Sequence, residues 1–314
     1  MNSFSFFLKT YEHDKERVIR LIESYNKHNI EKHLLYLMCP DEDVDCFSDW
    51  ESTTVRIIKE SAIKTDLFTE DTKWSKGYLN QEIFKLAFWE LGLCENYQCI
   101  DSDAVFIRDF VKRDFMYDED TPYTVLVEDN DLRADYYYNK LYWNGRMKWL
   151  KKIQDELDFH PYKMLTCHGF QIISAKAIKS FKEEFLEPRK YTYKSIIEIA
   201  PYEFSWYNFW LQKTEAIPIH MCEPNFKTFH LKQHLINDVL RGMSIDDWAK
   251  GYVGVVVNSN FDVGIGCYED LSVYSFENAE IPLKIIRKNY EFYGGLLKKR
   301  SGILKKAGDL LGKI

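Results

Sequence analysis

The chain has 314 residues and a formal net charge of −7 at pH 7. This length suits one large α/β domain or one domain with an appendage, and the acidic balance argues against a general nucleic-acid binder. Seven cysteines without regular spacing, and no Cys-x-x-Cys pair, predict reduced thiols in a cytosolic protein rather than a zinc site. Because no signal-peptide pattern and no apolar run of about 18 residues occurs, neither secretion nor a transmembrane helix is predicted.

The first segments predict a strand, a helix and two further strands. The strands are residues 3–8, 33–38 and 53–59, and the helix, 14–26, has Asp14 as a candidate N-cap. This order fits the opening of a nucleotide-binding half-sheet. The absence of a glycine-rich phosphate loop excludes a G-x-G-x-x-G dinucleotide site and a P-loop.

A second helix is predicted over residues 81–91, whose apolar positions follow a helical period. Gln81 and Lys85 lie four positions apart and therefore project from the same side of this helix. Lys85 is expected to pair with Asp101, to neutralise phosphate groups, or to be an ordinary surface lysine.

A buried strand ending at Ile100 is predicted next, with a tight turn at its carboxyl edge formed by Asp101, Ser102 and Asp103, and then a second apolar run, residues 104–107. In an extended segment, residues i and i+2 point to the same side, so Asp101 and Asp103 are expected to present oxygen atoms to one spot. Two such carboxylates favour a hard divalent cation, Mn²⁺ or Mg²⁺, between them. The alternative is a solvated Asp-x-Asp turn.

The stretch from Trp74 through this turn resembles a family of enzymes. Trp74, Gly77, Tyr78, Gln81, Lys85 and Leu86 resemble a "W-x-x-G-[WY]-x-x-Q-x-x-K-L" helix that precedes an Asp-x-Asp motif, with one more residue between Gln81 and Lys85 than that pattern has. Both are similar to nucleotide-sugar glycosyltransferases of the GT-A fold that build bacterial surface polysaccharides. The resemblance implies an α/β fold, with a GT-A-like, Rossmann-type mixed sheet flanked by helices. The catalytic domain would cover residues 1–240, with a nucleotide-sugar half up to about 130 and an acceptor half after it.

The same resemblance implies an activity and its partners. The chain would be a hexosyltransferase-like enzyme that transfers a sugar from a nucleoside-diphosphate sugar to a saccharide or lipid-linked saccharide. Donor or cofactor contacts would come from Thr10, Tyr11, Gln81, Lys85, Asp101, Ser102 and Gly169. Asp101 and Asp103 would hold the Mn²⁺ or Mg²⁺ ion, and His230 is the first choice for a histidine ligand, with His220 second. His168, beside Gly169, would contact donor or acceptor, or simply pack.

Two further segments are candidates for the acceptor side. Residues 136–149 are rich in aromatic side chains, which suit sugar C–H faces or core packing equally. Glu203 opens an aromatic helix with Tyr207 four positions on, and resembles the family's "S/P-x-E-x-x-x-Y" segment. It would act as the general base of an inverting transfer, with neighbouring aromatic residues raising its pKa by desolvation. Alternatively, Glu203 only caps the helix.

The C-terminal part is divided into residues 241–295, an extension without an assigned role, and 296–314. The last segment has a helical apolar stripe, six basic residues and one acid, Asp309. This pattern predicts a basic amphipathic helix that holds the protein on the anionic inner face of the cell membrane, or docks on the protein or a partner.

Two other function classes fit parts of the sequence. Residues 101–105 match the strand-D-x-D-x-[TV] motif of haloacid-dehalogenase-type phosphatases and phosphotransferases, with Asp101 as nucleophile. That motif normally follows the first strand of its domain, whereas several elements precede it here. A non-catalytic carbohydrate-binding protein is the third class.

Overall fold

The computed structural model describes residues 3–134, 139, 143–167, 169–230, 234–235, 238 and 241–257. These residues fall into two compact units. The first runs to Lys227 and includes Tyr252–Val255, and the second holds the described residues from Thr228 to Gly251 with Val256 and Val257. The predicted C-terminal helix, 296–314, lies outside the described residues.

The strands in the described part are β1 (Ser5–Lys9), β2 (Leu35–Cys39), β3 (Val55–Lys59), β4 (Asn96–Ile100), β5 (Ala104–Phe106), β6 (Tyr123–Val125), β7 (Ile172–Ser174), β8 (His220–Cys222), β9 (Phe226–Phe229) and β10 (Gly254–Val257). The helices are α1 (Lys15–His28), α2 (Val44–Phe47), α3 (Lys76–Ala87), α4 (Asn130–Ala134), α6 (Asn144–Leu157), α7 (Ala175–Ser180), α8 (Glu187–Arg189), α9 (Tyr193–Ile199), α10 (Glu203–Thr214) and α12 (Ile245–Ala249). The strands and helices predicted up to Ile100 are thus confirmed, with shifts at their ends.

Helix α3 begins five residues before the predicted start, at Lys76. Ser75 explains the difference, because its side chain accepts a hydrogen bond from the Tyr78 N–H at 3.3 Å and so caps the helix. Helix α7 continues past Ser180 as a π-helical turn, Phe181–Leu186. None of the described helices has the length and apolar character needed to cross a membrane.

The central sheet has the strand order β3-β2-β1-β4-β7. Strands β1 to β4 run parallel, and β7 pairs antiparallel with β4. The predicted mixed sheet flanked by helices is therefore confirmed. Because parallel strands end at a common edge, Lys9, Cys39, Lys59 and Ile100 mark one carboxyl edge of this sheet.

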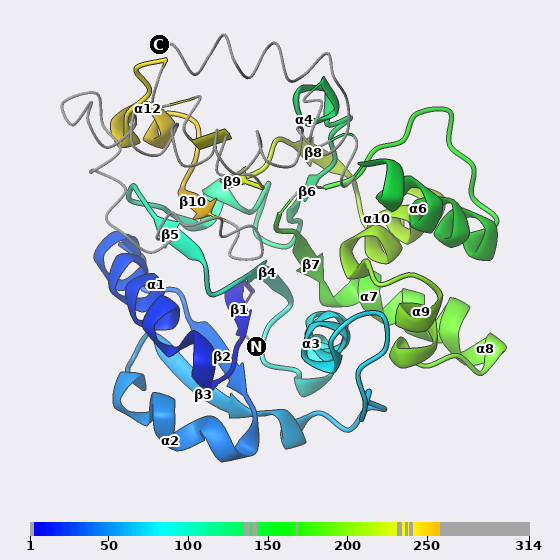
Figure 1. The fold of residues 1–314 in the computed structure, drawn as a ribbon, viewed down its shortest axis with the longest axis horizontal. Helices are drawn as coiled ribbons and strands as arrows, with labels where there is room; N and C mark the ends of the chain where they lie inside the picture. Colours follow the sequence, from blue (N-terminus) through cyan, green and yellow to red (C-terminus); the bar gives the residue numbers. More distant parts are fainter. Residues whose placement is uncertain are drawn as a thin grey trace, which may run out of the picture. The chain divides into compact units, whose positions relative to one another are not determined.

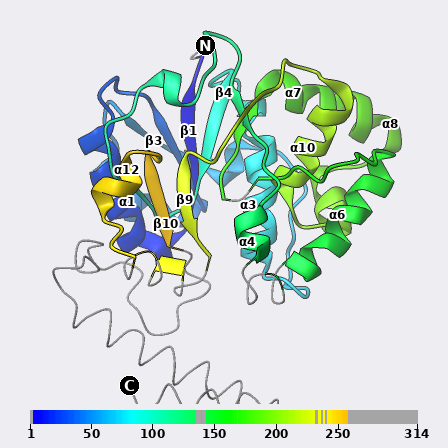
Figure 2. The same ribbon diagram turned by 90° about the horizontal axis from the view of Figure 1, so that it is seen from above.

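Two adjacent residues of β1 pack against helices on opposite faces of the sheet. Phe6 packs edge-on against Tyr25 of α1 with ring centroids 5.3 Å apart, whereas Phe7 stacks on Phe88, just after α3, at 4.2 Å. Successive strand residues point to opposite faces, so these contacts place α1 on one face and α3 on the other. Figures 1 and 2 show this arrangement, with α10 beyond α3 on the same side.

Two smaller sheets complete the strand pairing. Strand β6 pairs parallel with β8, and β5, β10 and β9 form a three-stranded sheet. Within the first unit, the Ile107 N–H donates to Val253 O at 2.9 Å, and the Val253 N–H donates to Asn225 O at 2.8 Å. Residues 251–257 are an apolar run for which no structure was predicted from the sequence. Strand β10, Gly254–Val257, forms most of this run.

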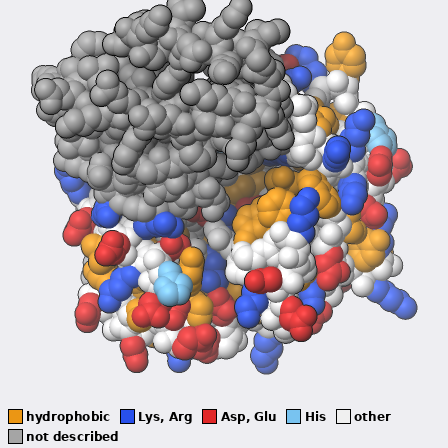
Figure 3. Space-filling view, viewed as in Figure 1, with side chains coloured by type: hydrophobic (Ala, Val, Ile, Leu, Met, Phe, Trp, Pro, Cys, Tyr) orange, Lys and Arg blue, Asp and Glu red, His pale blue; other side chains and the backbone are white. Residues whose placement is uncertain are grey.

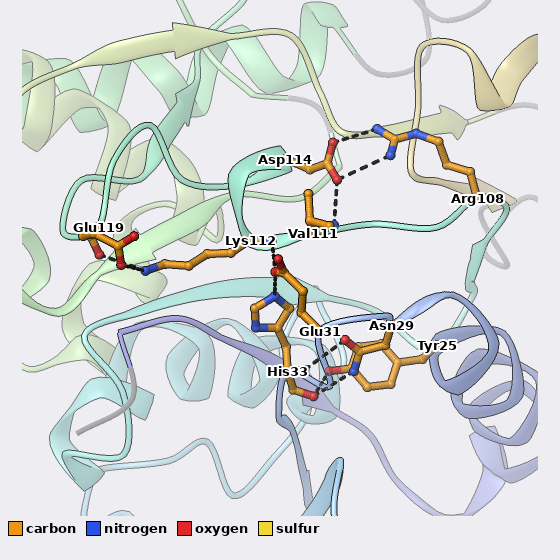
Figure 4. Close-up of polar contacts among 9 residues, drawn as sticks. All are labelled: Tyr25, Asn29, Glu31, His33, Arg108, Val111, Lys112, Asp114 and Glu119. Atoms are coloured by element: carbon orange, nitrogen blue, oxygen red, sulfur yellow. Dashed lines mark hydrogen bonds and ion pairs between the residues drawn. The ribbon is translucent and has the colours of Figure 1, made fainter.

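A polar network ties the loop after β5 to the turn between α1 and β2 (Figure 4). The Glu31 carboxylate accepts the Lys112 N–H at 2.6 Å and contacts His33 Nε2 at 3.0 Å. Further along the loop, Arg108 pairs with Asp114 at 3.0 Å. Because His33 precedes β2, this network lies at the amino end of that strand and not at the carboxyl edge.

Candidate active site

The Asp101-Ser102-Asp103 segment follows β4 at the carboxyl edge of the parallel strands, as predicted. It is a tight turn, closed by a hydrogen bond from the Ala104 N–H to Asp101 O at 3.1 Å. The predicted tight turn is therefore present, whereas the expected strand alternation does not orient the two carboxylates. Chain reversal at the sheet edge, which the apolar runs on either side require, explains the difference.

The Asp101 carboxylate contacts two side chains of α3. Gln81 Nε2 donates to Asp101 Oδ1 at 2.6 Å, and Lys85 Nζ lies 3.0 Å from the same oxygen. The Asp101 side chain is still 36% exposed. The predicted pairing of Lys85 with Asp101 is thus present, and both contacts fall on one carboxylate oxygen.

Lys85 joins Asp101 to the second half of the candidate site. Its Nζ lies 3.1 Å from Glu203 Oε1, at the start of α10. The Lys85 and Glu203 side chains are only 4% and 8% exposed. Four residues that the sequence singled out, Gln81, Lys85, Asp101 and Glu203, therefore meet around one buried ammonium group.

Glu82 is a buried member of this cluster that the sequence reasoning missed. Its Oε2 accepts the backbone N–H of Glu203 at 3.2 Å. Burial raises the pKa of Glu82 to about 8; the Lys85 charge opposes this shift and the Asp101 charge adds to it. Its only sequence signal is its place between Gln81 and Lys85 on α3, which a polar helix surface would explain equally well.

The Lys85 pKa is raised although the side chain is buried. Burial alone would lower it, but the negative charge of Asp101, joined by that of Glu82 at a pH where Glu82 is ionised, outweighs that effect. Lys85 therefore carries a fixed positive charge beside the Asp101 turn, which can attract an anionic group such as a phosphate.

Ser102 holds the turn against the start of α1. Its hydroxyl donates to Asp14 Oδ2 at 2.8 Å, and Arg17 Nη1 donates to Asp14 Oδ1 at 2.7 Å. Asp14 occupies the N-cap position of α1 as predicted, yet its side chain makes no capping hydrogen bond to the helix. Its oxygens serve the turn and Arg17 instead.

Thr10 and Tyr11 follow β1 on the same carboxyl edge. The Thr10 N–H donates to Met38 O at 2.9 Å. Its hydroxyl is buried and has no hydrogen-bond partner within the part of the chain that the structure describes. Tyr11 is 46% exposed. A buried hydroxyl without a partner is costly, so a ligand atom that bonds to Thr10 would be stabilised there.

Gly169 takes a left-handed conformation, with φ of 74°. Such a backbone angle favours glycine, because a Cβ atom would be strained there. The turn leads to Gln171, whose carbonyl accepts the Cys99 N–H of β4 at 3.0 Å. The turn at Gly169 thus brings the chain back beside β4, the strand that precedes Asp101. His168 lies outside the described residues.

The two histidines predicted as metal ligands, His220 and His230, belong to different compact units. His220 is in β8, where its ring stacks on Tyr117 with centroids 3.5 Å apart. His230 directly follows β9 and belongs to the second unit. Its role as a metal ligand stays a prediction.

The carboxylates of Asp101 and Asp103 would hold a divalent cation only together with oxygen ligands from a bound substrate. The described residues contain no group of three or more His, Cys, Asp or Glu side chains that could hold a metal ion. Mg²⁺ and similar ions are commonly bound by one or two carboxylates together with water and phosphate oxygens. The Asp101–Asp103 turn offers such carboxylates.

Two further hydrogen bonds hold the Glu203 segment in place, one to α3 and one to β7. Tyr78 donates its hydroxyl to Pro201 O at 3.0 Å. Tyr207, four positions after Glu203, accepts the Ser174 N–H on its hydroxyl at 3.0 Å. These bonds hold α10 between α3 and β7, which fixes Glu203 beside Lys85.

The fold and site define a mixed α/β protein with an acidic turn and a buried lysine at the carboxyl edge of its parallel strands. The chain belongs to the family described as "Family of unknown function (DUF6492)", whose sequence profile matches residues 5–227. The comparison with curated proteins gave no match. Among solved structures, the chain is similar to an apo structure of WbbM, a bifunctional glycosyltransferase, with a TM-score of 0.47 and 12% identity. The match covers 89% of this chain and 51% of the WbbM chain.

Proposed function

We propose that the protein is a glycosyltransferase that transfers a sugar from a nucleoside-diphosphate donor to a saccharide or lipid-linked saccharide. The observation that carries this proposal is the Asp101 turn at the carboxyl edge, held by the Lys85 ammonium at 3.0 Å. Ligands of open α/β sheets bind at that edge. A fixed cation next to carboxylates that can bind a metal ion suits a diphosphate, whose negative charge must be stabilised as it leaves.

Each residue that was predicted to bind the sugar donor has a role in the proposed reaction. Asp103 would hold Mn²⁺ or Mg²⁺, with Asp101 contacting the ion or the ribose, and His230 would complete the ligands. Lys85 would neutralise the diphosphate, with Gln81 orienting Asp101 and Ser102 fixing the turn. Thr10 and Tyr11 would contact the nucleoside, for which the unpartnered Thr10 hydroxyl is the supporting feature. Gly169 would allow close approach of the donor sugar.

Glu203 is the proposed general base of an inverting transfer. A base must be ionised and must reach the acceptor hydroxyl. The Lys85 contact at 3.1 Å occupies Oε1, one of the two Glu203 oxygens that could take the proton. We therefore propose that Lys85 turns toward the bound diphosphate and releases Glu203 for the acceptor. A transfer with retention needs no such base.

The test is release of nucleoside diphosphate in the presence of nucleotide sugars, candidate acceptors and Mn²⁺. Asp103→Ala should abolish turnover, whereas Glu119→Gln, which alters an exposed carboxylate beside Lys112, should leave it unchanged. An active Asp103→Ala enzyme would sink the metal assignment. Glu203→Gln should stop transfer while leaving donor binding intact, and NMR of the product anomer would show whether the reaction inverts.

The phosphatase alternative has one structural argument against it. Asp101 follows the fourth strand of the described sheet in chain order, and Lys85 and Gln81 already contact its Oδ1 atom. A nucleophilic aspartate needs a carboxylate oxygen directed at the phosphorus atom. Trapping a phosphorylated Asp101 would favour this alternative over the transferase.

A further inference from the structure

Aromatic and basic side chains alternate on a surface that includes the exposed side of α6. The strip consists of Lys73, Trp74, Arg146, Trp149, Lys152 and Tyr202. Lys73 Nζ lies 5.8 Å from the ring centroids of both Trp74 and Trp149, and Lys152 Nζ lies 4.4 Å from Trp149. The rings are partly buried against the core, so they are held in place rather than free in solvent.

The inner end of the strip adjoins the candidate active site. The Arg146 guanidinium lies 5.6 Å from the Tyr202 ring, and its Nη2 donates to Cys167 O at 3.0 Å. Tyr202 immediately precedes Glu203. Burial raises the Tyr202 pKa, the Arg146 charge lowers it and the Glu82 charge raises it, so the strip and the buried cluster share one electrostatic environment.

The strip is basic although the protein is acidic. Residues 144–152 contain four basic side chains and no acidic one, in a chain with a formal net charge of −7. Asp155 and Glu156 follow later on α6, and Asp71 near Lys73 accepts the Lys76 N–H at 2.8 Å. On the face seen in Figure 3, apolar side chains form a central patch with Lys and Arg side chains at its margins.

We infer that this strip binds a saccharide chain that carries negative charge, as the acceptor of the proposed transferase. Partly exposed Trp and Tyr rings pack against the C–H faces of sugars, and Lys and Arg beside them pair with carboxylate or phosphate substituents. A neutral glycan would use the rings but not the cations. The inference rests on the proposed function only for calling the ligand an acceptor, because binding itself needs no turnover.

The test is a calorimetric titration of the full chain, without donor, with an oligogalacturonate and with a neutral maltooligosaccharide of equal length. The acidic chain should bind, and its affinity should fall as salt rises. Lys73→Glu combined with Lys152→Glu should weaken binding about tenfold or more, since two attractions become repulsions. The matched control is Lys182→Gln, which removes a lysine 5.9 Å from the Trp89 ring on other elements and should leave the affinity within about twofold.

Three results would overturn the inference. Equal affinity for both saccharides would remove the role of charge, and absence of binding would remove the site. Binding to vesicles of anionic lipid with the same dependence on Lys73 and Lys152 would assign the strip to a membrane surface instead. A thermal-shift assay with nucleoside diphosphates on the same variants separates the two proposals, because the double variant should keep the nucleotide shift of the unaltered protein.

Discussion

Lys85 and Glu203 lie 118 positions apart in the sequence, and Lys85 Nζ hydrogen-bonds Glu203 Oε1 at 3.1 Å inside the protein. The same ammonium contacts Asp101 at 3.0 Å. One buried cation therefore connects the turn after the fourth strand with the start of α10. Any ligand that draws Lys85 toward itself changes the surroundings of both carboxylates.

Replacing Lys85 by methionine should destabilise the protein by about 3 kcal/mol or more, because it leaves the buried Glu203 carboxylate without its cation. Denaturant unfolding measures the effect. Lys182→Met is the matched control, since Lys182 also pairs with a glutamate, Glu90, but both side chains are partly exposed. Its cost should stay below about 1 kcal/mol.

A double variant separates the ion pair from packing. Adding Glu203→Gln to Lys85→Met removes one of the uncompensated charges, so the pair of changes should cost less than the sum of the single changes. Strict additivity would show that Lys85 and Glu203 do not interact in solution.

Glu82→Gln should change how stability depends on pH. The folded protein keeps a proton on Glu82 up to a pKa of about 8, whereas the unfolded chain releases it near the ordinary value of 4.5. Raising the pH through this window therefore lowers the free energy of unfolding of the unaltered protein, by up to about 1 kcal/mol per pH unit. Because glutamine does not titrate, the variant should lose this slope.

Unfolding at a series of pH values between these limits, in the presence of EDTA, measures that difference. The stability advantage of Glu82→Gln over the unaltered protein should grow steadily as the pH rises. A constant difference across the window would contradict the assignment of a proton to buried Glu82.

Gly254→Ala tests the small sheet that joins β5, β9 and β10. A Cβ atom on Gly254 would overlap the Phe226 ring and lie 2.8 Å from Val105 O. Such overpacking should cost about 1–3 kcal/mol. Gly145→Ala in α6 is the control, because its Cβ meets nothing within 4 Å, and it should stabilise by up to about 1 kcal/mol. Equal effects of the two changes would argue against this sheet.

Local patterns predicted much of the first unit. Apolar runs and helical spacing located β1 to β4 and the helices α1 and α3, because hydrophobic periodicity is a property of a few neighbouring residues. The acidic turn at Asp101 was predicted at the sheet edge for the same reason. The directions of its two carboxylates were predicted wrongly, because they were taken from strand alternation, which a turn does not follow.

Contacts between residues far apart in the chain could not be predicted from the sequence. Nothing near Lys85 indicates that Glu203 is its second partner, and Glu82 looks like an ordinary polar helix residue until the fold buries it. Arg146 became notable only when it was placed against Tyr202. The pairing of β10 with β5 and β9 depends likewise on contacts between distant segments.

The central claim is that the carboxyl edge beside Asp101 and Lys85 binds a nucleoside diphosphate together with a divalent cation. A thermal-shift titration with UDP, GDP, ADP, CDP and dTDP, each with and without Mn²⁺, measures it directly. We expect one nucleotide to stabilise the protein with Mn²⁺, by about 2.7 kcal/mol at a hundred times its dissociation constant, and Asp103→Ala to abolish the shift. No shift with any of these nucleotides, or the same shift in Asp103→Ala, would contradict the claim.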